Sequence, residues 1–348
     1  MLSWLRSLRP VEKGVTVVLG NMAADLDSGV STLVLAYHRA MSGHENVLPV
    51  INIPSQDFPL KTELVAALAG ENIRPEDLIF RDQIQLGQME DLKLILVDHN
   101  VLADDDVDLT DKVVEIIDHH VKETTMSSPN CMIEMVGSCS SLVLKKILSE
   151  NLEFSDLSSL RLIHKTILLD TVLLKPEAKK VTALDIMMVE QCESVLGNVD
   201  RQKIFRDLVE EKSRVSHLNA EQLLRRDFKT LSSSSFRVCI SAVPMLAKSW
   251  AGLPDLDDHL DTFLSRGGFS LLLVLGYSIK EERMERDLIV AGDDQCQEFK
   301  TIVQALQSSS SPHLELEQDT SVKNLLRFSQ GNIGASRKQI MPIVKSVL

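Results

Sequence analysis

The sequence lacks several features that would each place it in a definite class of protein. Its five cysteines are odd in number and include no CxxC pair, which argues against a disulfide-bonded secreted scaffold and for a reducing compartment. It has no excess of basic residues, because 37 Lys and Arg face 50 Asp and Glu for a net charge of −13. That balance argues against tracking of a DNA or RNA backbone. Its apolar runs fall far short of the ~20 residues that span a bilayer. We therefore expect a cytoplasmic protein, with the nucleus as the alternative, that binds neither nucleic acid nor membrane.

The sequence does contain short apolar runs of β-type character, and these alternate with helical patterns. In the first half, the predicted strands are 15–19, 47–53, 78–80, 94–97, 113–117 and 132–136. The predicted helices are 28–41, 64–68, 142–149 and 157–169, and the acidic segment 104–111 is predicted to be a loop. Continuous apolar strands alternating with helices at this spacing predict a parallel sheet covered on both faces.

The second half has a different pattern. Residues 181–211 are helical and charged with few strand signals, which indicates a connection between domains. After it, predicted strands at 236–243, 269–276 and 287–291 alternate with helices and indicate a second, smaller α/β domain. We expect domains at 12–190 and 213–348, joined by a connection at 191–212.

Acidic and imidazole side chains follow three of the predicted strands, and one more carboxylate ends a long apolar helix. In chain order these residues are Asp25, Asp27, Asp98, Asp118, His119, His120 and Asp170. Neighbouring parallel strands lie ~4.8 Å apart, so side chains at their carboxyl ends can converge. Clustered carboxylates repel one another unless cations compensate them. Asp and His without thiolate favour Mg²⁺, Mn²⁺, Co²⁺ or Zn²⁺, and two such ions ~3.5–4 Å apart support phosphoryl displacement.

Five short segments, in this order, resemble the motifs of the DHH phosphoesterases. They are GNMAADLDS (20–28), LVDHN (96–100), DHH (118–120), LLDT (168–171) and SRKQ (336–339), the last being similar to a signature of the DHHA2 domain. Within that superfamily the chain is similar to the prune-type exopolyphosphatases. The segments that carry this second similarity are VLGN (18–21), IFRD (79–82), VGSC (136–139) and QLLRRDFK (222–229). The resemblance implies a Rossmann-like DHH domain, a DHHA2 domain and an active site in the cleft between them.

The same resemblance implies two divalent ions, Mg²⁺ or Mn²⁺, with Co²⁺ as a further candidate. Asp25 and Asp98 would bind the first ion, and the second would be bound by Asp27, Asp98, His119 and Asp170, with Asp98 as the bridge. Family II inorganic pyrophosphatases carry a His where this chain has Asn21. Because an amide oxygen is a weaker ligand than imidazole, Asn21 would be a weak ligand of a looser first site that favours a hard ion.

The resemblance also implies a set of substrate-binding residues. His120 would bind the phosphate or protonate the leaving group, while Asp118 would orient an imidazole. Arg337 and Lys338 suit a multiply charged phosphate, since they offer a guanidinium fork and an ammonium. Lys212 is a further candidate cation, with a solvated helix face as the alternative. The segment 137–141 offers two interpretations, backbone N–H groups for a phosphate or a tight strand–helix turn.

We therefore expect an enzyme, an exopolyphosphatase that hydrolyses terminal phosphoanhydride bonds of tri- and tetraphosphate by attack of metal-bound hydroxide. Asp98 and His120 are the predicted catalytic residues. The alternatives are an inorganic pyrophosphatase, a cyclic nucleotide phosphodiesterase, or a prune-type protein that mainly binds protein partners, as yet unidentified, and retains a residual site. Asn21 counts against the pyrophosphatase.

Overall fold

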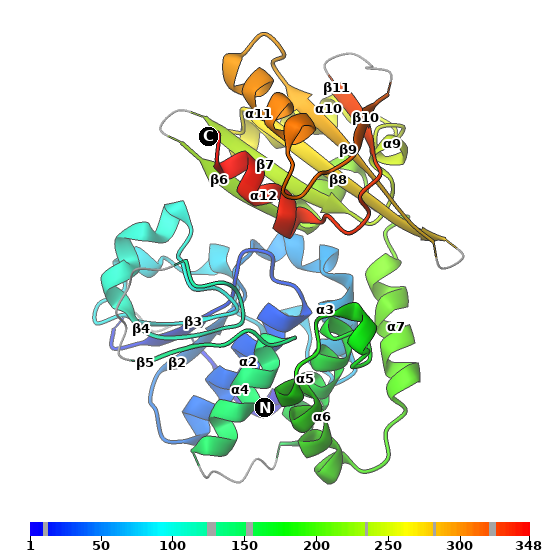
Figure 1. Ribbon diagram of the computed structural model, residues 1–348. Helices are drawn as coiled ribbons and strands as arrows, with labels where there is room; N and C mark the ends of the chain where they lie inside the picture. The colour runs from blue at the N-terminus through cyan, green and yellow to red at the C-terminus, as the bar shows by residue number, and fades with distance from the viewer. Residues whose placement is uncertain (10–12, 124–129, 151–155, 234–235, 281–282, 320–324) are drawn as a thin grey trace. The chain divides into compact units, whose positions relative to one another are not determined.

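The computed structural model describes residues 1–9, 13–123, 130–150, 156–233, 236–280, 283–319 and 325–348. The predicted domain start at residue 12 lies outside these ranges. The chain divides into two compact units, Met1–Arg214 and Val215–Leu348 (Figure 1). None of the helices in the described ranges is long and apolar enough to cross a membrane.

The N-terminal unit is built on a five-stranded sheet with the order β2-β1-β3-β4-β5. Its strands, all parallel, are β1 (Thr16–Leu19), β2 (Val47–Val50), β3 (Lys93–Val97), β4 (Val113–Asp118) and β5 (Asn130–Ile133). Successive side chains of one strand enter different cores. Val18 packs on the side of the helices, whereas Val17 and Leu19 pack in a separate cluster on the other side. Burial on both faces explains the uninterrupted apolar runs, and the parallel direction places every carboxyl end at one edge.

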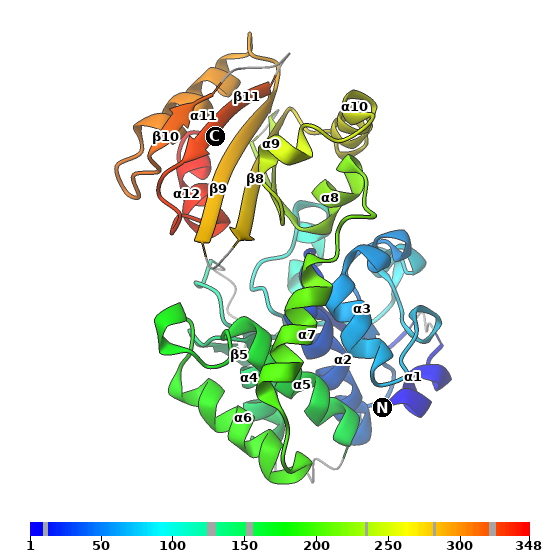
Figure 2. The same ribbon diagram turned by 90° about the vertical axis from the view of Figure 1, so that its right-hand side faces the viewer.

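Helices cover one face of this sheet. They are α1 (Leu2–Ser7), α2 (Leu26–Met41), α3 (Thr62–Ala69), α4 (Cys139–Ser149), α5 (Leu157–Asp170), α6 (Ala183–Leu196) and α7 (Arg201–Ser213). Contacts of α2 with β1–β3, and of α4 with β4, place these two helices directly on the strands. On the other face of the sheet, short turns of 3₁₀ helix contribute Leu86 and other residues to the apolar cluster that contains Val17 and Leu19. The chain then runs through α5, α6 and α7 in succession (Figure 2).

The C-terminal unit contains a six-stranded sheet with the order β10-β11-β9-β8-β7-β6, in which only β7 and β8 are parallel. The strands are β6 (Phe228–Ser232), β7 (Arg237–Val243), β8 (Leu271–Lys280), β9 (Arg283–Gly292), β10 (Leu316–Gln318) and β11 (Leu325–Gln330). The helices are α8 (Ala220–Arg226), α9 (Ala247–Trp250), α10 (Leu256–Gly267), α11 (Gln297–Ser308) and α12 (Arg337–Lys345). Helices α11 and α12 cover one face, and α8, α9 and α10 lie on the other (Figure 2).

Several predicted elements differ from the structure. The predicted strand 78–80 contributes only an isolated bridge between Phe80 and Ile51, and the predicted loop 104–111 is a 3₁₀ helix, Asp104–Lys112. Strand β5 begins two residues before the predicted 132–136, because its pairing with β4 covers Asn130–Ile133. Strands β6, β10 and β11 were not predicted, since β6 and β10 are short and only partly buried and β11 mixes apolar with polar residues.

Candidate metal and phosphate site

The predicted ligands lie at the carboxyl edge of the parallel sheet. In the strand order β2-β1-β3-β4-β5, the strand that follows β1 in sequence lies on one side of it, and the later strands lie on its other side. The switch point of the sheet therefore lies between β1 and β3. Ligands of open α/β sheets bind outside the strand ends at such a point. Asp25 and Asp27 follow β1, Asp98 follows β3, and His119 follows β4.

Asp27 is held in place by the first turn of α4. Its carboxylate is 3% exposed. The donors to Oδ1 are the Ser140 backbone N–H at 2.8 Å and the hydroxyls of Ser31, Ser138 and Ser140, and Oδ2 accepts from the Cys139 N–H at 2.6 Å. Two N–H groups of the 137–141 turn, those of Cys139 and Ser140, therefore bind a carboxylate of the chain itself, which favours the tight-turn interpretation. The same bonds leave Oδ2 of Asp27 3.8 Å from Nε2 of His119.

Asp98 is buried at the same edge in a left-handed backbone conformation. It is 3% exposed and has a φ of 62°, a left-handed conformation that Asp tolerates better than most residues. Asn21 donates from Nδ2 to Oδ2 of Asp98 at 2.7 Å and to its carbonyl at 3.2 Å. The oxygen of the Asn21 amide accepts from the N–H groups of Ala23 and Ala24. The amide that was predicted as a weak metal ligand thus acts on Asp98 through its nitrogen.

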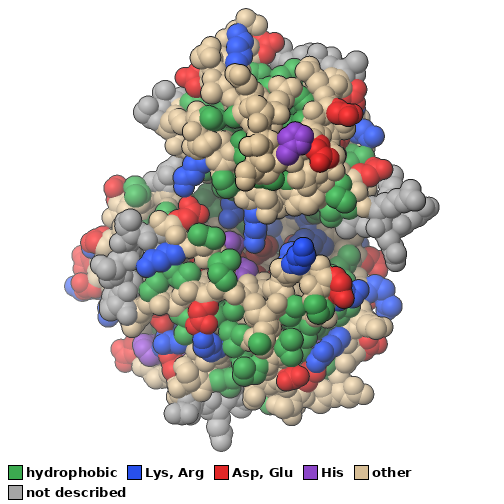
Figure 3. Space-filling model, in the orientation of Figure 1, with side chains coloured by type: hydrophobic (Ala, Val, Ile, Leu, Met, Phe, Trp, Pro, Cys, Tyr) green, Lys and Arg blue, Asp and Glu red, His purple; other side chains and the backbone are tan. Residues whose placement is uncertain are grey.

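The two histidines differ in their hydrogen bonds. Nδ1 of His119 lies 2.9 Å from the carbonyl of Val136, which makes Nδ1 the donor and leaves Nε2 as the nitrogen that can bind a metal once it is deprotonated. That Nε2 lies 3.2 Å from Oδ1 of Asp98. Nδ1 of His120 lies 2.8 Å from Oδ1 of Asp118. His120 is 29% exposed, and among the described residues none hydrogen-bonds to its Nε2, so this atom can meet a substrate. Histidine side chains reach the surface of the N-terminal unit in Figure 3.

Asp118 orients His120 from a fully buried position. Its carboxylate also accepts from the N–H groups of His119 and His120, and from Nδ2 of Asn100 at 2.5 Å. Burial acts to raise the pKa of Asp118, but the hydrogen bonds from His120 and Asn100 outweigh it and lower that pKa to about 2. Asn100 was not predicted, although it stands in the LVDHN motif.

Asp170 ends α5, and its Oδ2 is buried without a hydrogen bond from any described residue. Burial, followed by the charges of Asp27 and Asp25, raises the pKa of Asp170 well above its ordinary value, while the charge of Lys212 opposes this shift. Asp25 therefore interacts with the same cluster, although its Oδ1 also caps α2 by accepting from the N–H of Ser28.

These residues fit a divalent cation. One donor atom from each of Asp98, His119 and His120 lies within 4.8 Å of the other two. Oδ1 of Asp98, like Oδ2 of Asp170, is buried without a hydrogen bond from the described residues. Burial and the charge of Asp27 raise the pKa of Asp98 to about 7, a sign that the cluster needs positive charge. Burial raises the pKa of the Cys139 thiol well above its usual range, so the donor set is carboxylate and imidazole.

The predicted phosphate-binding residues Arg337 and Lys338 open α12 in the C-terminal unit. The Arg337 guanidinium lies 2.7 Å from Oδ1 of Asp227 and donates to its carbonyl at 3.0 Å. Lys229, which was not predicted as a site residue, lies in β6, and that strand begins directly after Asp227. The QLLRRDFK motif contained this lysine.

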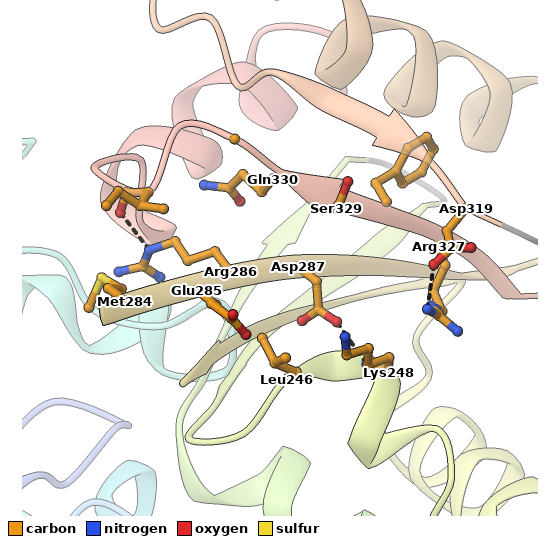
Figure 4. Close-up of a pocket in the computed structure, with 13 residues that line it drawn as sticks. Leu246, Lys248, Met284, Glu285, Arg286, Asp287, Asp319, Arg327, Ser329 and Gln330 are labelled. Atoms are coloured by element: carbon orange, nitrogen blue, oxygen red, sulfur yellow. Dashed lines mark hydrogen bonds and ion pairs between the residues drawn. The ribbon is translucent and has the colours of Figure 1, made fainter. Parts of the chain in front are cut away.

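A hollow of about 390 Å³ in the C-terminal unit contains none of the predicted site residues (Figure 4). Two of its cations, Arg327 and Arg286, are engaged by the protein itself. Arg327 forms an ion pair with Asp319, and Arg286 donates from Nε to the carbonyl of Ile333 at 2.8 Å. The hollow therefore offers partly neutralised charge and none of the residues that the sequence predicted for the site.

Comparison with known proteins agrees with this geometry. Residues 15–174 match the DHH family, N-terminal domain, and residues 206–347 match the DHHA2 domain. Exopolyphosphatase PRUNE1 of Homo sapiens is 35% identical over 354 residues, which cover 99% of this chain and 77% of that protein. The manganese-dependent inorganic pyrophosphatase of Methanocaldococcus jannaschii is 26% identical, over 77% of this chain and 84% of its own length.

A solved structure shares the fold. The crystal structure of a putative family II inorganic pyrophosphatase from Methanococcus jannaschii matches with a TM-score of 0.67 at 21% identity, covering 96% of this chain and 99% of that one. Three findings agree with one another. They are the two matched domains, the 35% identity to an exopolyphosphatase over 99% of this chain, and the cluster of carboxylates and imidazoles. The chain belongs to the prune-type exopolyphosphatase family of the DHH phosphoesterases, with a DHH domain followed by a DHHA2 domain.

Proposed function

We propose that the protein is a metal-dependent phosphohydrolase that cleaves terminal phosphoanhydride bonds of short inorganic polyphosphate, tri- and tetraphosphate. The observation that carries the proposal is the cluster of Asp27, Asp98, His119 and Asp170, in which Asp27 and Asp98 are buried. Oδ1 of Asp98 and Oδ2 of Asp170 are buried and accept no hydrogen bond from the described residues. The similarity to a protein named exopolyphosphatase supports the substrate class.

Two divalent ions, Mn²⁺ or Mg²⁺, would be held by five side chains of the N-terminal unit. Asp25 and Asp98 would hold the first, and the second would be held by Asp27, Asp98, His119 and Asp170. Such ions lower the pKa of bound water and neutralise charge that develops on phosphate oxygens. The manganese dependence of the similar pyrophosphatase supports a divalent metal. Asn21 serves in this scheme by holding Asp98, since its oxygen already accepts two backbone hydrogen bonds.

The remaining residues act on the substrate. His120 would donate a proton or a hydrogen bond from Nε2 to the departing phosphate, and Asp118 keeps Nδ1 engaged so that Nε2 faces the substrate. Arg337 and Lys338 would bind the phosphate tail, with Lys229 as a further cation. Lys212 would supply a cation from the N-terminal unit. The five unpaired cysteines fit the cytoplasm or the nucleus.

Release of phosphate from a panel of substrates tests the proposal. The panel consists of pyrophosphate, tripolyphosphate, long-chain polyphosphate and cyclic AMP, each with Mg²⁺, Mn²⁺ or Co²⁺. We expect the highest kcat/KM for tripolyphosphate and no turnover after removal of divalent ions by EDTA. Faster turnover of pyrophosphate than of tripolyphosphate would contradict the proposed substrate. It would favour the second candidate, an inorganic pyrophosphatase, which the similarity to the manganese-dependent enzyme supports.

A further inference from the structure

The first turn of α3 and the last turn of α7 are joined by two adjacent contacts, which the proposed mechanism does not use. The hydroxyl of Thr62 donates to the carbonyl of Glu211 at 2.6 Å. One residue further along each helix, Oε1 of Glu63 lies 3.7 Å from Nζ of Lys212. The two helices lie side by side in Figures 1 and 2. Together these contacts fix the end of α7 to the start of α3.

The two charges of this pair have different surroundings. The Glu63 side chain is only 6% exposed, whereas the Lys212 side chain is 42% exposed. Each stands where the helix dipole favours it, Glu63 in the first turn of α3 and Lys212 in the last turn of α7. Burial of a carboxylate is costly without a cation, so Glu63 is a fixed anchor for an ammonium that solvent and ligands can still reach.

Helix packing brings Lys212 toward the cluster of carboxylates and imidazoles. Helix α7 packs against both α3 and α5, and Asp170 is the last residue of α5. Lys212 stands at the matching end of α7, and its charge acts on the Asp170 carboxylate. The ammonium thus pairs with Glu63, and its charge also acts on Asp170, which comes from a different helix.

We propose that Glu63 is a positioning residue that holds the ammonium of Lys212 beside Asp170, where Lys212 binds a non-bridging oxygen of the substrate phosphate. The identity of that phosphate rests on the proposed function. An ammonium has three donor hydrogens, so it can pair with a carboxylate and bind a phosphate oxygen together. Without Glu63, the flexible lysine stem would spread its charge over many rotamers, and the substrate would have to order it on binding.

The opposite role for Glu63 gives the opposite result. If Glu63 competed with phosphate for Lys212, its neutralisation would release the ammonium and strengthen substrate binding. If Glu63 served the helix packing alone, its substitution would lower stability without a change in KM. A rise in KM after substitution of Glu63 therefore indicates positioning, whereas a fall indicates competition and an unchanged KM indicates a packing role alone.

Steady-state kinetics with tripolyphosphate and Mn²⁺ provide the first test, on Lys212→Met, Glu63→Gln and the double variant. We expect Lys212→Met to raise KM about tenfold, Glu63→Gln to raise it about fivefold, and kcat to change less than about threefold. The double variant should match Lys212→Met in KM, because a positioning Glu63 affects substrate binding through the lysine. Glu63→Asp should recover part of the loss. Lys203→Met, an exposed lysine of α7 paired with Asp207, is the matched control and should retain the parent KM. A lower or unchanged KM in Glu63→Gln, or multiplicative effects in the double variant, would overturn the inference.

A second readout does not depend on turnover. Reductive ¹³C-methylation labels the lysines, and the Lys212 resonance is the one missing from Lys212→Met. We expect this resonance to move in Glu63→Gln and on addition of tripolyphosphate to the parent. A parent that leaves tripolyphosphate intact while the resonance responds to Glu63→Gln would retain the positioning role and remove the proposed function. A parent that hydrolyses tripolyphosphate while the resonance ignores Glu63→Gln would remove the positioning role alone.

Discussion

The two units use sheets of different direction, and this difference decides where reactive side chains gather. In the N-terminal unit all strands are parallel, so segments distant in sequence bring Asp27, Asp98 and His119 to one edge. In the C-terminal unit most neighbours are antiparallel, so the strand ends are divided between two edges. Its charged residues pair locally, as Arg327 does with Asp319. The parallel sheet gathers several carboxylates at one edge, whereas charges of the mixed sheet, such as those of Arg327 and Asp319, pair one with one.

The largest loss of activity should follow removal of the Asp98 carboxylate, which lies at the edge of the parallel sheet. Asp98→Ala removes the predicted bridging ligand, and we expect kcat/KM for tripolyphosphate to fall at least about a thousandfold. The unfolding transition should persist, because Asp98 makes no contact that the apolar cores require. Phosphate release and circular dichroism check both points. Asp319→Ala in the C-terminal unit is the matched control and should retain parent activity. Equal losses in the two variants would show that the parallel edge has no special role.

Core substitutions should show whether the two units also differ in stability. Leu96→Ala in β3 and Leu273→Ala in β8 each truncate a fully buried leucine, and each should lower the free energy of unfolding by about 2–5 kcal/mol. Trp4 and Trp250 lie in different units. Urea unfolding followed by fluorescence in Trp4→Phe reports on the C-terminal unit, and that in Trp250→Phe on the N-terminal unit. We expect each leucine variant to shift the transition of its own unit more; identical shifts in both would indicate a single cooperative structure.

The C-terminal cations should have a smaller effect, confined to substrate binding. Arg337→Met removes the guanidinium that pairs with Asp227. We expect KM for tripolyphosphate to rise about 10- to 100-fold, since a charge-assisted bidentate contact is lost. Arg337→Lys should restore only part of this loss. Arg327→Met is the control, because Arg327 also pairs with a carboxylate, that of Asp319, but is not a predicted substrate-binding residue. A similar rise in that variant would contradict the assignment.

The smallest expected effect concerns the pH dependence of stability in the N-terminal unit. His38 is 5% exposed, and burial lowers its pKa below 6.5 despite the hydrogen bond to Glu150. A lowered folded pKa means that the unfolded chain binds more protons as the pH falls below 6.5. The contribution of His38 is therefore complete above that pH and is lost as the pH falls through the folded pKa. As the pH falls below 6.5, the free energy of unfolding should decline less steeply in His38→Gln than in the parent protein. Equally steep declines in the two proteins would refute the assignment.

Hydrophobic pattern and residue type predicted much of the fold. The apolar runs that became β1, β3 and β4 could be found because a strand buried on both faces must be apolar throughout. The strands β6, β10 and β11 could not be found in this way, since their side chains are only partly apolar and their pairing depends on distant neighbours. The predicted strand 78–80 failed for a related reason, because local apolar character does not provide a partner with matching register.

The sequence by itself determined which carboxylates and imidazoles end the parallel strands, because strand ends follow from local pattern and ligand chemistry follows from residue type. Only the tertiary structure decided what each of those side chains contacts. Asp27 is held by α4 more than a hundred residues away, Asn21 binds Asp98 across the β1–β3 switch point, and Lys212 is held by Glu63. Such contacts depend on strand register and helix packing. These bring together residues that are far apart in sequence and that no local sequence pattern links.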